Sequence, residues 1–155
     1  QVAILALNFK SKDTFDDLER AAITGKNVNR ELLEKIYFRA ITRMKALAKE
    51  RNEDYFSEDL IREYFRRRHN ELLDGMFTDI GDKGIDIDKN APPALKHLCK
   101  VFKSKIIKKG SDYYIVEYFD DNTRKTRPVS NSLLPDANIG DEVIIHYGYA
   151  VEKVS

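Results

Sequence analysis

Cys99 is the one cysteine of the chain, and His97 stands two residues before it. A thiolate and an imidazole are ligands that zinc and iron take in proteins. Lys96 and Lys100 flank the pair, and their charge would favour the thiolate form of the cysteine. One cysteine and one histidine supply only half of a four-ligand site. The pair therefore predicts either part of a metal site or a small, half-buried cysteine at a junction between two parts of the chain.

A second group of residues combines aromatic and basic side chains. Small barrels of the oligonucleotide-binding type hold single-stranded nucleic acid in this way, because aromatic rings stack on the bases and cations follow the phosphates. The residues that would form such a surface are Tyr113, Tyr114, Tyr118, Lys105 and Lys108. Alternation along a strand puts Tyr114 and Tyr118 on one face and Tyr113 on the other. At least one of these two faces must belong to the core.

Residue arrangements typical of catalysis are not found in the sequence. It contains no phosphate-binding loop, no HExxH motif and no recognisable Ser-His-Asp arrangement. An acidic cluster consists of Asp79, Asp82, Asp86 and Asp88. Its spacing does not match a calcium loop, which needs a glutamate at its twelfth position. We therefore expect a solvated linker there and a protein that is not an enzyme.

The elements that must position these residues begin with helices. Asn29 is a typical helix cap, and apolar residues from Leu32 to Ala48 recur at three- and four-residue spacing, which predicts one amphipathic helix that ends near Asn52. Ser57 caps a further helix that ends close to Gly75. A shorter helix is expected around residues 13–24. Two long amphipathic helices joined by a short turn are expected to pack as an antiparallel pair.

After Ala91-Pro92-Pro93 the apolar pattern changes from the period of a helix to that of a strand. The prolines predict a short helical turn through Leu98, followed by five short strands with turns at residues 109–111, at residues 120–122 and at Gly148. Short strands with tight turns predict a small antiparallel barrel. The expected organisation is α+β, with a helical domain over residues 1–90 and a β-barrel domain over residues 91–155.

The composition narrows the class of protein. A chain of 155 residues is long enough for one ordinary domain or two small ones. Its net charge of +1 lacks the basic excess that is typical of a dedicated nucleic-acid-binding protein. A single cysteine cannot form an internal disulfide, which favours an intracellular, cytoplasmic protein. No apolar stretch approaches the roughly 18 residues that a membrane span needs.

The order of parts from Leu98 to the end of the chain resembles the hydrogenase-assembly chaperone family (HypC/HupF). The shared features are Leu98-Cys99 at the start, a hairpin through Phe119, a basic strand, and a Leu-Leu-Pro element. The most specific part is the stretch from Ile139 to Ala150, which matches the family's Val-Gly-Asp-x-Val-x-Val-His-x-Gly-Phe-Ala. The resemblance covers about residues 98–155, and it implies an OB-like, HypC-like barrel.

The resemblance also implies roles for particular residues. Cys99 aligns with the cysteine that helps the family to handle iron together with a partner protein. In that family the cysteine follows the initiator methionine, whereas Cys99 stands mid-chain, and Lys100-Val101-Phe102-Lys103-Ser104 replaces the family's Leu-Ala-Ile-Pro-Gly. The residues that would contact a partner are Cys99, Lys100, Arg124, Lys125, Arg127 and His146.

Three hypotheses follow from the sequence. The leading one is a non-catalytic protein-interaction or assembly-chaperone-like module that binds another protein and needs no cofactor. The alternative is binding of RNA or single-stranded DNA through the barrel face. The third is a metal-carrying chaperone in which Cys99, with His97 nearby, handles iron.

Overall fold

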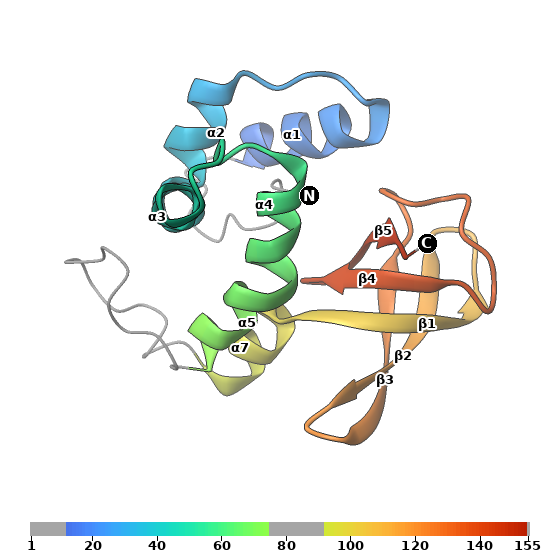
Figure 1. The fold of residues 1–155 in the computed structure, drawn as a ribbon. Coiled ribbons are helices and arrows are strands. Elements are labelled where there is room, and N and C mark those ends of the chain that lie inside the picture. The colour runs from blue at the N-terminus through green and yellow to red at the C-terminus, as the bar shows by residue number, and fades with distance from the viewer. Residues whose placement is uncertain (1–11, 75–91, 155) are drawn as a thin grey trace.

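The structure is a computed structural model that describes residues 12–74 and 92–154. It is α+β, with helices in the amino-terminal part and strands in the carboxy-terminal part, as expected (Figure 1). The acidic cluster Asp79, Asp82, Asp86 and Asp88, the glycine Gly75 and the proposed boundary at residues 90–91 lie outside the described residues.

The helical part begins with α1 (Lys12–Thr24), α2 (Arg30–Ile36) and α3 (Phe38–Arg51). It continues with α4 (Glu58–Glu63), the π-helical turn η2 (Tyr64–Arg68) and α5 (His69–Leu73), which follow one another along the chain. The side chains of Asn29 and Ser57 cap α2 and α4, as the sequence predicts.

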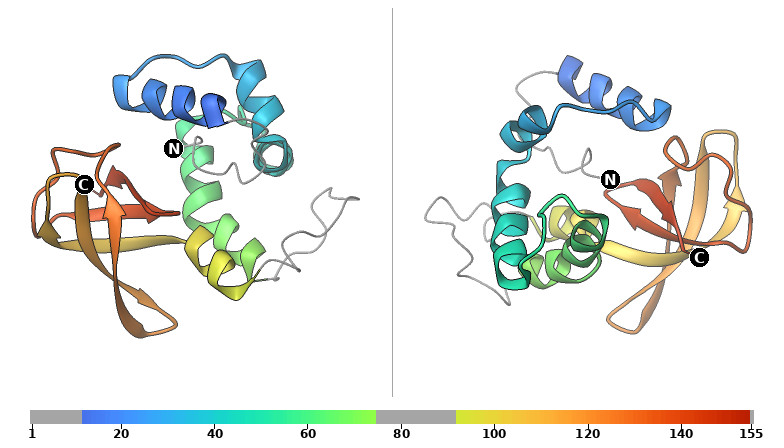
Figure 2. Two further views of the ribbon diagram at one scale, coloured as in Figure 1. Left: turned by 180° about the vertical axis from the view of Figure 1, so that it is seen from behind. Right: turned by 45° about the horizontal axis from the view of Figure 1, so that its top comes forward.

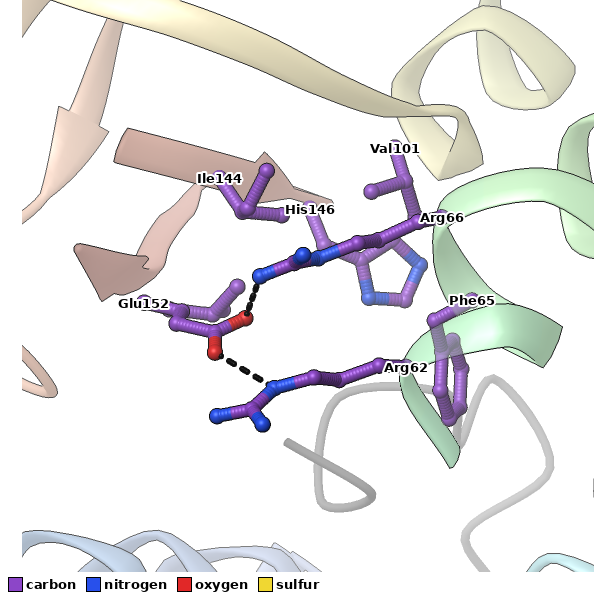
Figure 3. A pocket seen from close by; sticks show the side chains of 8 residues that line it. Arg62, Phe65, Arg66, Val101, Ile144, His146 and Glu152 are labelled. Carbon is purple, nitrogen blue, oxygen red and sulfur yellow. Dashed lines mark hydrogen bonds and ion pairs between the residues drawn. The ribbon is translucent and has the colours of Figure 1, made fainter. Parts of the chain in front are cut away.

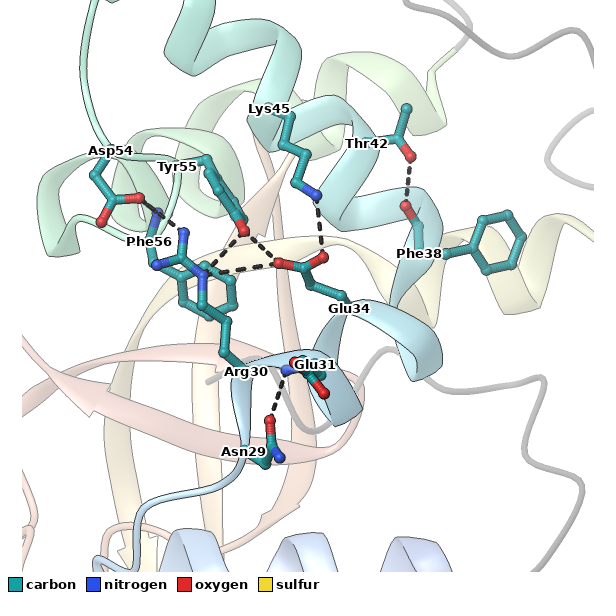
Figure 4. A network of polar contacts seen from close by, with 10 residues as sticks. All are labelled: Asn29, Arg30, Glu31, Glu34, Phe38, Thr42, Lys45, Asp54, Tyr55 and Phe56. Atoms are coloured by element: carbon teal, nitrogen blue, oxygen red, sulfur yellow. Dashed lines mark hydrogen bonds and ion pairs between the residues drawn. The ribbon is translucent and has the colours of Figure 1, made fainter.

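The single helix expected from Leu32 to Ala48 is wrong, because the chain bends at Tyr37 between α2 and α3. The bend brings Glu34 to Lys45, with 3.1 Å between the carboxylate and the ammonium nitrogen. In a straight helix these two residues would be about 16 Å apart along the axis. Glu34 also accepts a hydrogen bond from the Tyr55 hydroxyl. Figure 4 shows the resulting network, which ties α2 and α3 to the loop before α4.

The expected antiparallel pair of helices is also wrong. Figure 1 looks down the axis of α3 while α4 and α5 run across the view, so the two helices cross. Asn52, in the left-handed conformation, ends α3, and the chain turns before Ser57. The crossing lets Leu60 and Tyr64 join a core that includes residues of the sheet as well as α3.

The strand part begins with the short helix α7 (Pro93–Cys99), which the two prolines predict. The described strands are β1 (Val101–Lys109), β2 (Tyr113–Asp120), β3 (Thr123–Ser130), β4 (Glu142–His146) and β5 (Tyr149–Lys153). Hydrogen bonding runs round the closed order β1-β2-β3-β5-β4. All pairs are antiparallel except β3 with β5, which meet in parallel at one residue pair, Ser130 and Tyr149. Gly140 and Gly148 have φ of 95° and 132°, so the glycines of the motif occupy turns that favour glycine.

The molecule has two hydrophobic clusters, and neighbouring residues of β4 belong to different ones. Val143 and Ile145 point into the sheet's inner cluster, together with Ile106, Tyr114, Val116 and Tyr118. Ile144 points out of the sheet and, with Val101, joins the cluster formed by the helices. Figure 2 shows the helices gathered on one side of the sheet. The helical and strand parts therefore share one of their two cores.

Candidate functional site

The end of the β2–β3 hairpin is the place where several of the predicted site residues meet. Asp121 and Asn122 form its two-residue turn with φ of 47° and 62°, the conformation that Asn and Asp tolerate in tight hairpins. The turn sets the register, with Tyr118 opposite Lys125 and Val116 opposite Arg127. Lys125 and Arg127 thereby share the face of Tyr118, whereas Arg124 belongs to the opposite face.

Asp120 is the centre of a charged cluster between this hairpin and α7. Its carboxylate lies 2.7 Å from the Lys125 ammonium, 3.3 Å from His97 Nδ1 and 3.9 Å from the Lys100 ammonium. Its side chain is only 10% exposed. The hydrogen bond from Lys125 lowers the pKa of Asp120 below its usual value, and the charges of Lys125 and Lys100 act in the same direction. The structure therefore brings His97, Lys100 and Lys125 together around one acid that the sequence analysis did not select.

His97 uses both ring nitrogens inside this cluster. Its Nε2 lies 3.0 Å from the Tyr118 hydroxyl, and its Nδ1 faces Asp120. Burial lowers the pKa of His97, although the charge of Asp120 opposes this shift. A neutral His97 can donate from Nδ1 to Asp120 and accept from the hydroxyl of Tyr118. The ring is therefore held as part of a hydrogen-bond network.

Cys99 ends α7 and is half-buried. Its backbone carbonyl oxygen lies 3.1 Å from Nε2 of His69. Across residues 12–74 and 92–154, no group of three or more His, Cys, Asp or Glu side chains is arranged to hold a metal ion. Cys99 and His97 therefore do not fit an iron or zinc site with the described residues, and we derive no metal chemistry from them.

Arg127 lies on the inner side of β3 against two aromatic rings. Its guanidinium carbon is 5.7 Å from the centre of the Phe102 ring and 5.3 Å from that of Tyr118. All three guanidinium nitrogens are shielded from solvent, and none has a hydrogen-bond partner among the described residues. Burial lowers the pKa of Arg127. An unpaired buried cation is costly, because water is lost and no acid replaces it.

The outer side of the hairpin is different in character. Arg124 is exposed and forms an ion pair with Glu117 across the two strands. Phe119, between Tyr118 and Asp120, is 63% exposed, more than any other phenylalanine or tyrosine whose side chain the structure describes. The hairpin therefore presents a bare phenylalanine opposite Arg124 on its outer side, away from the face that carries the cluster of Asp120.

His146 is buried on the outer face of the sheet and not on the surface of the molecule. Its ring centre lies 5.4 Å from that of His69 and 5.9 Å from that of Phe65. Burial lowers the pKa of His146 to about 3, and the nearby His69 and Arg127 lower it further. His146 therefore belongs to the packing between helices and sheet, which separates it from the other predicted partner-binding residues.

A small pocket lies beside His146 (Figure 3). Its volume of about 10 Å³ suits at most one water molecule. Glu152 of β5 closes it by binding Arg62 at 2.9 Å and Arg66 at 2.7 Å. These bridges join β5 to α4 and η2, so the pocket is a seam between the two parts of the chain rather than a site for a ligand.

The residues predicted for nucleic-acid binding do not form one surface. Tyr114 and Tyr118 are buried in the inner core of the sheet, so their rings cannot stack on bases. Tyr113 is half-buried, while Lys105 and Lys108 are exposed on β1. Only the two lysines and part of Tyr113 remain available to a nucleic acid.

Tyr114 instead fixes the loop that carries the Leu-Leu-Pro element. Its hydroxyl lies 2.7 Å from the Leu134 carbonyl, 3.0 Å from that of Pro135 and 3.1 Å from that of Ala137. The ammonium group of Lys109 contacts the last two carbonyls as well. One tyrosine and one lysine thus hold a segment that has no strand of its own.

Replacing Tyr114 with Phe is expected to lower the free energy of unfolding by about 1–2 kcal/mol, because buried carbonyls lose a donor while the ring keeps its packing. Urea unfolding followed by circular dichroism measures the change. Tyr113→Phe is the matched control, since within the described residues the tyrosine hydroxyl that bonds to this loop is that of Tyr114 and not that of Tyr113. Equal losses in both variants would show that the hydroxyl of Tyr114 does not anchor the loop.

Comparisons with known proteins found no relative of this chain. No family model matches the chain, no curated protein matches it, and no solved structure matches it. Within the described residues, no helix combines the length and apolarity needed to cross a membrane.

Proposed function

We propose that this chain is a non-catalytic protein-interaction module that binds a partner protein through the end of its β2–β3 hairpin. The observation that carries the proposal is Phe119, which is 63% exposed and stands opposite Arg124 on the outer side of the hairpin end. Aromatic residues and Arg are enriched at the centres of protein interfaces. A partner that covers a large exposed apolar side chain gains the free energy of burying that apolar surface.

The same surface suits a protein better than a nucleic acid. Lys125 and Arg124 are already paired with Asp120 and Glu117, and phosphate binding needs cations that are free to bind. The aromatic residues at the hairpin end are Phe119, which is exposed, and Tyr118, which is buried. One exposed ring does not make the row of stacking platforms that single strands need.

The finer part of the proposal concerns the sheet, which we take to be a small closed barrel of the hydrogenase-assembly chaperone kind. Its support is the motif from Ile139 to Ala150 and the positive φ of Gly140 and Gly148 within it. An assembly chaperone works by holding a partner protein, and a docking hairpin is consistent with that role. The helical part would then brace the barrel through Val101 and Ile144.

The proposal predicts that Phe119→Asp weakens partner binding at least about tenfold, as for an interface centre worth 1.4 kcal/mol or more. The full chain is used as bait in extracts of its source cells, with and without nuclease, and co-purifying proteins are identified by mass spectrometry. Each purified partner is then titrated against the variants by calorimetry. Ile23→Asp is the matched control, because Ile23 is also apolar and is 51% exposed but lies on α1.

Two outcomes would contradict the proposal. In the first, Phe119→Asp retains every partner with unchanged affinity, which would place the interface elsewhere. In the second, nuclease removes all captured material, which would favour the nucleic-acid alternative. Neither substitution is expected to change the free energy of unfolding by more than about 0.5 kcal/mol, because both residues are exposed.

A further inference from the structure

The outer edge of β3 is the feature that extends the proposed function. In an antiparallel pair, alternate residues turn their backbone groups away from the partner strand. The backbone N–H of Ser130 donates to the Gly148 carbonyl at 2.7 Å, so Ser130 faces away from β2. By the two-residue repeat, Pro128, Thr126 and Arg124 face away as well. Pro128 agrees with this assignment, because a proline has no N–H to give to β2.

Within residues 12–74 and 92–154, these outward backbone groups have no strand beside them. The parallel contact with β5 occurs at Ser130 alone, and β5 continues from there away from the hairpin end. Arg124, Thr126 and Pro128 are all exposed, and among the described residues none of their backbone groups bonds to a further strand. Figures 1 and 2 show the hairpin standing out from the other strands. The chain thus offers two N–H donors and three carbonyl acceptors along one short edge.

Arg127 is on the same strand, and it differs from the strand's other cations because no acid pairs with it among the described residues. Arg124 has Glu117 and Lys125 has Asp120. For Arg127, no acid lies within salt-bridge distance in the described part of the chain, and its three nitrogens lack hydrogen-bond partners. Two independent features of β3, an open edge and a buried cation without an anion, are therefore only one residue apart.

From this juxtaposition we infer that the β3 edge binds an extended acidic peptide segment, which adds to the sheet as a new strand and places a carboxylate on Arg127. The inference rests on the proposed function, since it names the chemistry of the partner. Strand addition supplies main-chain hydrogen bonds, and alternate side chains supply specificity. A residue opposite Arg127 on the added strand has its Cβ about 5 Å away, within reach of the guanidinium.

A second copy of this chain is not the expected occupant. Two β3 strands side by side would bring Arg124, Lys125 and Arg127 against the same three cations, and facing like charges disfavour pairing. Pro128 also removes one donor from the edge, which blunts self-association. An acidic segment meets the opposite situation, because a carboxylate opposite Arg127 meets the cation of this strand that has no acid among the described residues.

Binding requires the guanidinium of Arg127 to turn from the rings of Phe102 and Tyr118 toward the open edge. The exchange replaces two cation–π contacts by a charge-assisted and bidentate ion pair. Arg127 as a residue is half-buried while its three guanidinium nitrogens are shielded, so its solvent-exposed surface belongs to its other atoms. The aromatic pair then remains as the floor of the site.

The first test uses two synthetic peptides of seven residues that alternate threonine and valine around a central glutamate or glutamine. Each is titrated into the full chain, and binding is followed by NMR of the backbone amides and of the Arg127 Nε–H. We expect the glutamate peptide to bind about tenfold or more tightly than the glutamine peptide, the ratio typical of hydrogen bonds to charged groups. Amides of Arg124 and Thr126 should become protected from hydrogen exchange.

The second test uses variants of β3. Arg127→Gln should remove the difference between the two peptides, whereas Arg124→Gln, on the outer face of the same strand, should retain it. Thr126→Pro removes an outward N–H without touching the bonds to β2, so it should abolish binding of both peptides while the fold persists. Circular dichroism melts report whether each variant is folded. If a variant does not fold, the comparison of the two peptides on the unmodified chain still tests the inference.

Equal affinity for the two peptides, or protected amides outside β3, would overturn the inference. If a partner purified through the experiment of the previous section depends on Phe119 but binds Thr126→Pro and Arg127→Gln normally, strand addition is wrong and the interaction module stands. If Phe119→Asp keeps all partners, the proposed function fails whatever the peptides do.

Discussion

Acidification from pH 7 to pH 5 is expected to lower the free energy of unfolding by about 2 kcal/mol through His146 alone. Burial lowers the pKa of His146 to about 3, from an ordinary value of 6.5. Between these two pH values the unfolded chain binds a proton that the folded chain excludes. The stability is therefore complete above pH 6.5 and is lost as the pH falls toward 3. His69 on α5 and Arg127 on β3 strengthen the effect, because both disfavour a second positive charge nearby.

Urea unfolding at pH 7, 6 and 5 measures this loss, and His146→Leu is the informative variant. It removes the titrating group, so its free energy of unfolding should change less between pH 7 and pH 5 than that of the unmodified chain. Carboxyl groups with lowered pKa values, such as Asp120, respond mostly below pH 5 and affect both proteins alike. The same slope in both proteins would show that His146 is not buried between helices and sheet in solution.

The strand part of the fold could be predicted closely because its signals are local. Turn residues mark where strands end, and Asp121 and Asn122 adopt the conformation that their side chains allow. Alternation correctly separates Val143 and Ile145 from Ile144 and His146 on β4. The same alternation leaves open which face of β2 is buried, and only the assembled sheet assigns Tyr114 and Tyr118 to the core.

The helical part was harder to predict because its shape depends on contacts between residues far apart in the sequence. An apolar stripe from Leu32 to Ala48 has the same period whether the helix is straight or bent. The bend at Tyr37 depends on Tyr55 and Lys45, which reach Glu34 only once the chain has turned back. The crossing of α3 and α4 likewise depends on Val101 and Ile144, which belong to the other part of the chain.

The sequence predicts several residues of the candidate site but not how they are arranged around Asp120. The sequence singles out His97, Lys100, Lys125 and Arg127, whereas it marks Asp120 only as part of a turn. The hairpin register follows from a two-residue turn, and it would have placed Lys125 near Asp120 and Arg127 on the face of Tyr118. The packing of α7 against that hairpin has no local signal in the sequence.

Truncation of the two adjacent isoleucines of β4 is expected to unfold different parts of the molecule. Ile145 is fully buried in the inner core, and Ile145→Ala should cost about 3 kcal/mol and expose all strands to hydrogen exchange. Ile144 is buried under the helices, and Ile144→Ala should cost about 2 kcal/mol. Its loss should speed exchange in α3, α4 and α5 first, because it removes a contact that holds these helices on the sheet.

Ile139→Ala is the matched control, because Ile139 precedes the same strand but is 64% exposed, so its truncation should change the stability by no more than about 0.5 kcal/mol. The comparison tests whether the helices and the sheet form one cooperative unit, since adjacent residues of one strand face the two cores. An Ile144→Ala variant as stable as Ile139→Ala would mean that the helices do not pack on the sheet in solution. In that case the sheet would have to be stable alone, and the pH response of His146 would disappear with the contact that buries it.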